Sequence, residues 1–288
     1  EYLGIFNACG GAGKGMRFFN TGTIDMNGTN SYGIYVSSVV RGRPFIELTT
    51  PININGIGNT GLILSQEFDL SPSTIKLNIG GTSLATDAVG IYSNYNKGGN
   101  NNLGSWLSGS YMELNNYNLK ITNSTNSILT YMNKGNLQFN SGSPVTINGT
   151  NNKGFVTTDT AKLRLNNDIT AIGDHNLGLY ADATSEIEYT GTISMDGYKS
   201  HGIGINSSGS KLNNYLNGIV SITVQGDESV AIYNKGTTNL LNGGTFTSTG
   251  NKGGIIYNAG GTTNLTGTNT YEVGANGVGF FVTGGKLT

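Results

Sequence analysis

The stretch T-G-T-I-D-M-N-G-T-N-S-Y-G-I-Y-V, residues 21–36, contains the features that decide the fold. Ile24 and Met26 alternate with polar residues, which is the pattern of a half-buried strand. Gly28 then marks a turn, and the motif G-I-Y at residues 33–35 begins a second short strand. Such short strands cannot bury an apolar face alone, so this unit must pack against others like it.

The G-I-Y motif or a close variant recurs from end to end of the chain, and its apolar residue serves as an anchor for aligning the copies. Five of the nine spacings between successive anchors equal 24 residues, and a glycine stands six residues before eight of the ten anchors. That glycine column was not used to choose the anchors, so it indicates a real repeat. The anchors are Ile34, Leu62, Ile91, Tyr131, Phe155, Leu179, Ile203, Ile232, Ile256 and Phe280.

A third segment completes each unit, with apolar pairs such as Leu137 and Phe139 or Leu163 and Leu165. Three short strands and three corners in about 24 residues must stack on the next copy to bury their apolar side chains. The sequence therefore predicts an all-β, right-handed parallel β-helix, a solenoid of about ten coils of about 24 residues with three short strands per coil. The glycine column predicts corners with positive φ.

The spacing of the anchors also predicts how the chain is divided. Residues 1–20 fit no column and predict an irregular or distorted first coil, whereas residues 21–288 predict a single β-helix domain. Extra residues must leave the coil as loops. The longest spacing predicts an inserted loop near residues 94–110, and a second long spacing predicts a shorter loop near residues 207–217.

The composition excludes several classes of protein. Only 11% of residues are charged, against about a quarter in ordinary soluble domains. The chain has 46 Gly, 39 Asn and 34 Thr, which favour turns and strands over helices, and its four prolines exclude collagen. A net charge of −1 gives no basic surface for nucleic acid, and the lone Cys9 cannot form an internal disulfide.

No motif in the chain predicts a catalytic residue, a metal site or a cofactor site. The string G-G-A-G-K-G at residues 10–15 departs from the phosphate-binding loop, because Ala8 and Gly15 stand where the pattern needs Gly and Ser or Thr. His175 and His201 occupy different columns of the repeat. With one cysteine and no tight acidic cluster, the residues needed for a metal site are missing.

Five carboxylates leave open an alternative in which the chain cleaves polysaccharides. β-Helix enzymes of that class use two or three carboxylates on the outer face, and glycoside hydrolysis in general uses a pair. The carboxylates within one coil are Glu186, Glu188, Asp168, Asp174 and Asp182. The preferred interpretation is that they are solvated surface charges.

Aromatic residues give two candidate binding surfaces. One is a stripe one position after the anchor, which strand alternation turns outward: Tyr35, Tyr92, Tyr180, Tyr233, Tyr257 and Phe281. The stripe is either a contact surface for sugar or protein, or an aromatic ladder that only supports the fold. The other is the inserted loop and its surroundings, with Tyr95, Trp106, Tyr111 and Tyr117.

Three strings carry a family resemblance: T-G-T-I-S-M-D-G-Y-K-S-H-G-I-G-I-N at residues 190–206, V-A-I-Y-N-K-G-T-T-N-L at 230–240 and G-I-I-Y-N-A-G-G-T-T-N-L at 254–265. They resemble the passenger regions of large type V autotransporter adhesins, and their Asn-rich character is most similar to the fusobacterial outer-membrane adhesins. The resemblance covers about residues 20–288. The resemblance implies an architecture, but it does not identify any binding residue in this chain.

This resemblance implies a non-catalytic extracellular adhesin on the bacterial cell surface, attached to the membrane only through a C-terminal barrel that is not among these 288 residues. The implied partner is a host-cell surface protein or glycan, or another bacterium, with self-association of rods as a variant. Two alternatives remain open: a polysaccharide-cleaving β-helix enzyme and a passive structural spacer within a long surface rod.

Overall fold

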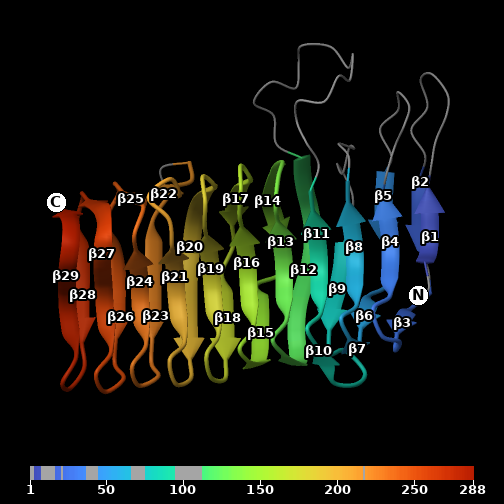
Figure 1. The fold of residues 1–288 in the computed structure, drawn as a ribbon, viewed down its shortest axis with the longest axis horizontal. Coiled ribbons are helices and arrows are strands. Elements are labelled where there is room, and N and C mark those ends of the chain that lie inside the picture. Colours follow the sequence, from blue (N-terminus) through green and yellow to red (C-terminus); the bar gives the residue numbers. More distant parts are fainter. Residues whose placement is uncertain are drawn as a thin grey trace, which may run out of the picture.

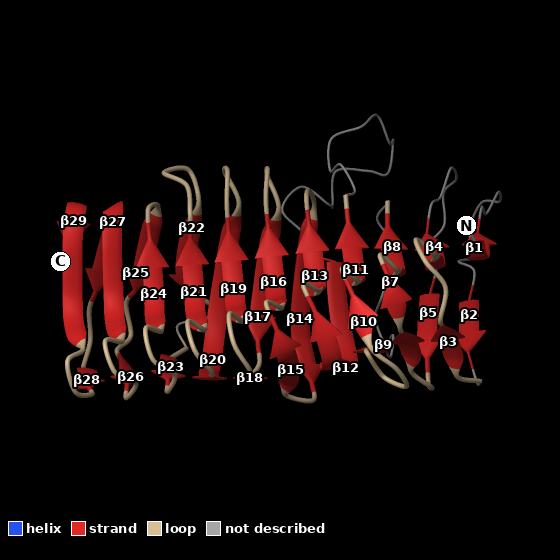
Figure 2. Cartoon of the chain, turned by 60° about the horizontal axis from the view of Figure 1, so that its bottom comes forward, coloured by secondary structure: helices blue, strands red, loops and turns tan. Residues whose placement is uncertain are grey.

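A computed structural model describes residues 3–7, 17–20, 22–36, 45–65, 75–94, 112–216 and 218–288. Within these ranges every regular element is a strand, and every pairing between strands is parallel (Figure 2). The strands lie side by side along one long axis, from β1 (Leu3–Asn7) to β29 (Val278–Leu287) (Figure 1). The prediction of an all-β, right-handed parallel β-helix is confirmed.

Each turn visits three columns of strands in a fixed order, here called A, B and C. Column A carries the G-I-Y motif: β1, β4 (Tyr32–Val36), β8 (Thr60–Leu64), β11 (Val89–Ser93), β13 (Ile128–Met132), β16 (Lys153–Thr157), β19 (Leu177–Ala181), β21 (His201–Ile205), β24 (Val230–Asn234), and the first parts of β27 (Gly254–Leu265) and β29.

Columns B and C complete the turn. Column B contains β2 (Arg17–Asn20), β5 (Phe45–Leu48), the start of β12 (Met112–Thr125), β14 (Asn136–Gly142), β17 (Lys162–Asn166), the start of β20 (Glu186–Asp196), β22 (Lys211–Asn214), β25 (Thr237–Leu240), and the ends of β27 and β29. Column C contains β3 (Ile24–Met26), β6 (Ile52–Ile54), β9 (Ile75–Ile79), the end of β12, β15 (Val145–Thr150), β18 (Ile169–Ile172), the end of β20, β23 (Val220–Val224), β26 (Gly244–Ser248) and β28 (Asn269–Val273). Two further short strands, β7 (Gly56–Ile57) and β10 (Ala85–Thr86), pair at the corner between columns C and A.

The repeat of 24 residues places like positions directly against one another. Phe155 pairs with Leu179, and Leu179 pairs with Ile203, each fully buried. Each such side chain contributes about 1.5–3 kcal/mol by leaving water. The column B positions predicted to be apolar, such as Leu163 and Ile187, are buried in the same continuous core.

One anchor of the sequence alignment is wrong by one residue. Ile91 pairs with Thr130, and Thr130 pairs with Phe155, so Thr130 occupies the inward anchor position of β13. Tyr131 instead pairs with Tyr92 in the outward row. Hydrophobicity misplaced the anchor because this turn has a buried threonine at the position that is apolar in its neighbours.

The prediction that the glycine column marks corners with positive φ is only partly right. Gly149 and Gly173 do have positive φ, at 115° and 112°. Gly226 and Gly250, in the same column, do not. A Cβ on Gly226 would lie 1.7 Å from the carbonyl oxygen of Gly197 in the preceding turn. Close stacking of the corner backbones therefore requires glycine even where φ does not.

A buried polar ladder runs along the corner before column A. The backbone N–H of Asn152 donates to Asn176 Oδ1 at 2.9 Å, and that of Asn176 donates to Ser200 Oγ at 3.1 Å. The backbone N–H of Ser200 continues the series by donating to Ser229 Oγ at 3.0 Å. Asn176 Nδ2 also donates to the carbonyl oxygen of Gly149 at 2.9 Å. The side chain of Asn176 thus binds the preceding turn, and its backbone N–H binds the following one.

The inserted residues can be placed by the register of the pairs. Glu186 pairs with Lys211, an offset of 25, whereas Gly191 pairs with Val220, an offset of 29. Most of the second insertion therefore lies between Asn214 and Val220, at the C-terminal edge of the expected range 207–217 and beyond it. The first insertion, expected near residues 94–110, falls almost wholly on residues 95–111, which lie outside the described residues.

Part of the first twenty residues belongs to the stack. Ile5 of β1 pairs with Ile34 of β4, and Phe18 of β2 pairs with Ile46 of β5. The segment expected to be an irregular first coil therefore contributes one strand to column A and one to column B. Residues 8–16 between them lie outside the described residues.

Candidate binding surfaces

The predicted aromatic stripe forms the outward row of column A, one residue after the buried anchors. Tyr92 and Tyr131 are paired in this row, and so are Tyr233 and Tyr257. From Tyr35 onward the row is Tyr35, Ile63, Tyr92, Tyr131, Val156, Tyr180, Gly204, Tyr233, Tyr257 and Phe281. The row is therefore a discontinuous aromatic surface that follows the long axis.

The two aromatic stretches of this row differ in how their rings are arranged. Tyr92 and Tyr131 stack with centroids 5.7 Å apart and planes 4° apart, so each ring places a face against the other. Tyr233 and Tyr257 meet at 67° with centroids 5.4 Å apart, and Tyr257 and Phe281 meet at 46° and 5.0 Å. In the second stretch the rings therefore meet edge to face or at a tilt and are not stacked face to face.

Three polar side chains, Asp182, Asn206 and Lys235, lie just past the strand ends, two residues after Tyr180, Gly204 and Tyr233. Tyr180 donates its hydroxyl hydrogen to Asp182 Oδ2 at 3.2 Å, and Asn206 Nδ2 donates to the same oxygen at 3.2 Å. On the following turn Lys235 places its ammonium 5.5 Å from the ring centroid of Tyr233. Aromatic faces and hydrogen-bonding groups thus occupy parallel rows on one surface.

The electrostatics of this surface are set by Asp182. Burial raises the pKa of Tyr180 to about 12, helped by the charge of Asp182 and the hydrogen bond between them. Burial pushes the pKa of Asp182 upward, but hydrogen bonds from the Ala183 N–H, Asn206 and Tyr180, together with the charge of Lys235, hold it below its ordinary value. Asp182 is therefore a carboxylate and Tyr180 a neutral phenol at neutral pH.

Tyr117, expected to be a binding residue next to the inserted loop, is part of the core. It lies in β12 with 1% of its surface exposed, and its ring packs edge-on against Phe139 at 5.2 Å. Its hydroxyl accepts a hydrogen bond from Asn167 Nδ2 at 2.9 Å, and burial raises its pKa to about 12. The other loop candidates, Tyr95, Trp106 and Tyr111, lie outside the described residues.

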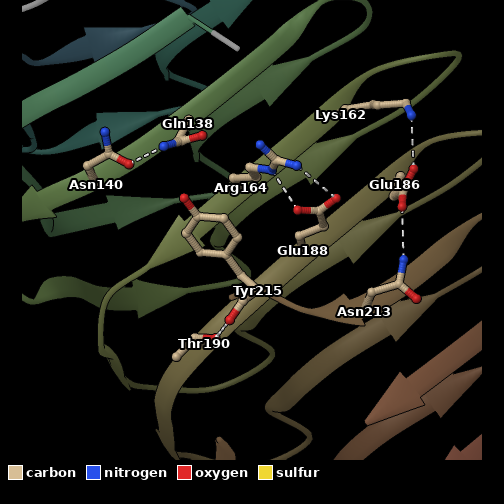
Figure 3. Close-up of polar contacts among 9 residues, drawn as sticks. All are labelled: Gln138, Asn140, Lys162, Arg164, Glu186, Glu188, Thr190, Asn213 and Tyr215. Carbon is tan, nitrogen blue, oxygen red and sulfur yellow. Dashed lines mark hydrogen bonds and ion pairs between the residues drawn. The ribbon is translucent and has the colours of Figure 1, made fainter. Parts of the chain in front are cut away.

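The two glutamates of the enzymatic alternative lie on the outward face of column B, each paired with a cation (Figure 3). Arg164 binds Glu188 through Nε at 2.6 Å and Nη2 at 3.4 Å. Lys162 Nζ lies 3.1 Å from Glu186 Oε2, and Asn213 Nδ2 donates to Glu186 Oε1 at 2.9 Å. Both carboxylates are thus held by groups from the turns before or after them.

The aspartates of that alternative also have structural partners. Asp168 Oδ1 accepts a hydrogen bond from the backbone N–H of Thr192 at 2.8 Å, and Asp174 Oδ1 accepts one from that of Tyr198 at 2.9 Å. Each joins one corner to the next, 24 residues later. Asp168 and Asp174 therefore lie at two corners of the turn, whereas Glu186 and Glu188 lie on column B.

Sequence reasoning missed the polar ladder on the outside of column B. Asn239 Nδ2 donates to Asn213 Oδ1 at 2.8 Å, and Asn264 Nδ2 donates to Asn239 Oδ1 at 2.7 Å. It also missed the cations Lys162 and Arg164. The sequence does contain polar residues about 25 positions apart that indicate this ladder. They were overlooked because the repeat is least regular in the segment that forms column B.

The two histidines differ in environment. His201 Nδ1 accepts a hydrogen bond from the backbone N–H of Val230 at 3.0 Å, so it replaces a carbonyl oxygen in the ladder between turns. Burial, and then the charge of nearby His175, lower the pKa of His201. Among the described residues no group of three or more His, Cys, Asp or Glu side chains could hold a metal ion.

Comparisons with family models, curated proteins and solved structures gave no match. A search of the described residues also found no helix with the length and hydropathy needed to cross a bilayer.

Proposed function

We propose that this chain is a segment of a non-catalytic extracellular adhesin, a rigid rod on the bacterial surface that resembles the passengers of type V autotransporters. The observation that carries the proposal is the outward row of column A, which carries the aromatic side chains Tyr180, Tyr233, Tyr257 and Phe281. Polar side chains lie beside the first two of them, at Asp182, Asn206 and Lys235. Tyrosine supplies apolar contact area with a polar group at its tip, which suits recognition of sugars and proteins.

The stacked turns also favour a role in display. Successive turns are joined by parallel strand pairs and by the ladder of Asn152, Asn176 and Ser200, so a surface row keeps its geometry along the rod. Binding residues on a rigid scaffold lose less conformational entropy when a ligand is bound. The proposed partners are a host-cell surface protein or glycan, another bacterium, or a second rod.

The proposal is tested by coating beads with the chain and measuring their attachment to host cells and to bacteria. We expect attachment that falls at least tenfold when Tyr233 and Tyr257 are both replaced by Ala. The control replaces Thr146 and Thr170, an in-register pair on the outward side of column C that is half-buried at Thr146 and exposed at Thr170, with Ala. Aggregation of the beads with one another would instead indicate self-association.

Two outcomes would contradict the adhesive role. Beads that attach to neither cells nor bacteria would favour a passive spacer. Cleavage of a polysaccharide that is abolished by Glu186→Gln or Glu188→Gln would favour an enzyme. The ion pairs of these two glutamates with Lys162 and Arg164 are the reason for expecting no cleavage, since an ion-paired carboxylate is disfavoured as a general acid.

A further inference from the structure

The outward side of column C carries a row of side chains unlike those on the outward sides of columns A and B. Five of its members are uncharged hydroxyl residues, with a cation at one end and a carboxylate at the other. All seven residues are half-buried or exposed. This hydroxyl row is Lys120, Thr146, Thr170, Ser194, Thr223, Thr247 and Glu272.

The side chains of the hydroxyl row have no partners within the described part of the chain. On the outward face of column B, by contrast, Arg164 binds Glu188, and Asn239 donates a hydrogen bond to Asn213. Neither a hydrogen bond nor an ion pair joins any side chain of the hydroxyl row to another described residue. The row therefore presents hydrogen-bonding groups and two opposite charges to the outside of the rod.

The spacing of the hydroxyl row selects the partner. Adjacent turns lie about 4.8 Å apart, so the six steps from Lys120 to Glu272 span about 29 Å. A partner that contacts every member must repeat at the same spacing over that length. A second copy of this chain does so because it has the same stack of turns. Hydroxyl groups both donate and accept hydrogen bonds, so the row can also pair with itself.

The charges at the two ends of the row set the orientation of the copies. Two rods that point the same way would bring Lys120 against Lys120 and Glu272 against Glu272, which like-charge repulsion disfavours. Two rods that point opposite ways bring each Lys120 against Glu272 of the other copy. Ser194 is the middle member, three turns from either end. A twofold axis at Ser194 therefore brings both pairs of opposite charges together.

We propose that the hydroxyl row is a self-association surface through which two antiparallel rods pack face to face. Thr170 of one copy then lies against Thr223 of the other, and Thr146 lies against Thr247. This inference deepens the proposed function, because it names the second rod as a partner and identifies the face that binds it. That face is distinct from the aromatic row of column A, to which attachment to cells is assigned.

Two further charged residues, Asp168 and Asp196, flank the row. Asp168 Oδ1 accepts the backbone N–H of Thr192 at 2.8 Å, and Asp168 lies one turn from the axis, so it does not face its own copy. Asp196 is exposed and lies two residues after Ser194, at the end of β20. It would face its own copy across the axis, so it opposes the two favourable charge pairs. Asp196→Asn should therefore strengthen the association.

The size of the face determines the assay. A face about 29 Å long and one strand of three residues, about 10 Å, wide covers about 300 Å² per copy. Stable interfaces cover about 800 Å² per partner, so a single pair of these rods associates weakly. Many rods on one surface act together, which makes the aggregation rate of densely coated beads the appropriate measurement.

The experiment exchanges the two end charges. Lys120→Glu and Glu272→Lys each place like charges against one another, and each should slow aggregation at least tenfold. The variant that combines both substitutions restores opposite charges and should aggregate at nearly the parent rate. Beads that carry one single variant should also aggregate with beads that carry the other. The matched control is Lys211→Glu, the same charge change on the exposed outward side of column B, which should leave the rate unchanged.

Three results would overturn the self-association surface: parent beads do not aggregate, the combined variant does not recover, or Lys211→Glu slows aggregation as much as Lys120→Glu. Unaltered far-ultraviolet circular dichroism and melting temperature show that each variant is folded.

Failure of this surface is distinguishable from failure of the adhesive role, because the two lie on different columns. Alanine at Thr146 and Thr170 should weaken aggregation but not attachment to cells, and alanine at Tyr233 and Tyr257 should do the reverse. Beads that attach to cells without aggregating would leave the adhesive role without this surface. Beads that aggregate but attach to nothing else would leave the surface without attachment to other partners.

Discussion

The inward and outward rows of column A are one residue apart in sequence and opposite in character. Leu179 and Ile203 pair in the inward row and are fully buried. Tyr180 and Gly204, next to them, pair in the outward row, where a large aromatic ring lies over a residue with no side chain. Along the inward row the side chains are limited to those that the core can pack, whereas along the outward row they differ in size and chemistry.

The difference between the two rows separates residues that the fold constrains from residues that are free to serve function. An inward side chain contacts its counterparts in the turns before and after it, so the stack constrains its size and polarity. An outward side chain is constrained much less by the fold. The better evidence for function therefore comes from outward residues that the fold does not require, such as Gly204.

The strongest test of this comparison places one substitution in each row. Ile203→Asp buries an unpaired charge and should lower the free energy of unfolding by about 4 kcal/mol or more. Gly204→Ser, on the adjacent outward position, should change it by less than about 1 kcal/mol. Urea denaturation followed by circular dichroism measures both. Equal losses would show that the assignment of inward and outward rows is wrong.

The buried polar ladder tests whether every inward position must be apolar. Asn176→Leu leaves the backbone N–H of Asn152 and the carbonyl oxygen of Gly149 without these partners, and should cost about 3 kcal/mol. Asn176→Ser should cost only about 1 kcal/mol, since serine occupies the same ladder position at Ser200. A leucine variant as stable as the parent, compared by the same denaturation experiment, would contradict a structural role for the ladder.

The hydrogen bond accepted by His201 should make stability depend on pH. The pKa of His201 is lowered by burial and by the charge of His175, so the folded state favours the neutral imidazole. Its contribution is therefore present above the ordinary histidine pKa and is lost as the pH falls through that value to the lowered one. The melting temperature should fall on acidification below about pH 6.5.

The matched variant for this effect is His201→Asn, whose side-chain oxygen can accept the same bond from the Val230 N–H without titrating in this range. Its melting temperature should change less than that of the parent between neutral pH and pH 5.5, a window about one unit wide below the ordinary histidine pKa. Identical pH profiles for the two proteins would show that His201 is not the titrating group.

The outward ion pairs should have the smallest effect. Glu188→Gln removes the charge that binds Arg164 but keeps a hydrogen-bond acceptor, and both partners are only partly buried. The free energy of unfolding should fall by no more than about 1 kcal/mol, and less at high salt. A loss as large as that of Asn176→Leu would mean that the outward face of column B matters for the fold as much as the core.

Most of the fold could be predicted from the sequence because the turn length is nearly constant. The repeat of 24 residues is enough to place Phe155, Leu179 and Ile203 in one stack, as the strand register has them. Thr130 was missed because a buried polar residue breaks the apolar pattern on which the alignment depended. Residue 226 must be glycine because a Cβ there would clash with the carbonyl oxygen of Gly197 in the preceding turn. The local sequence does not show contacts between turns.

The candidate site was less predictable than the fold. Strand alternation correctly turned Tyr180, Tyr233 and Tyr257 outward. It could not show that Tyr117, close to a long insertion, is in the core, because that depends on its contact with Phe139 in the next turn. Nor could it bring Asn206 to Asp182, which depends on the register between β19 and β21.

Residues one repeat apart are neighbours in adjacent turns, and disulfide cross-linking is a direct test of this arrangement. Thr146 and Thr170 are paired on the outward side of column C, and Thr170 is paired in turn with Ser194. In-register parallel strands lie about 4.8 Å apart, so one step is within the Cα range of a disulfide, whereas two steps exceed its limit of about 7 Å. In a Cys9→Ser background, the account predicts that mild oxidation cross-links cysteines at 146 and 170, and those at 170 and 194, but not those at 146 and 194. Failure of the one-turn pairs, or efficient cross-linking of the two-turn pair, would contradict it.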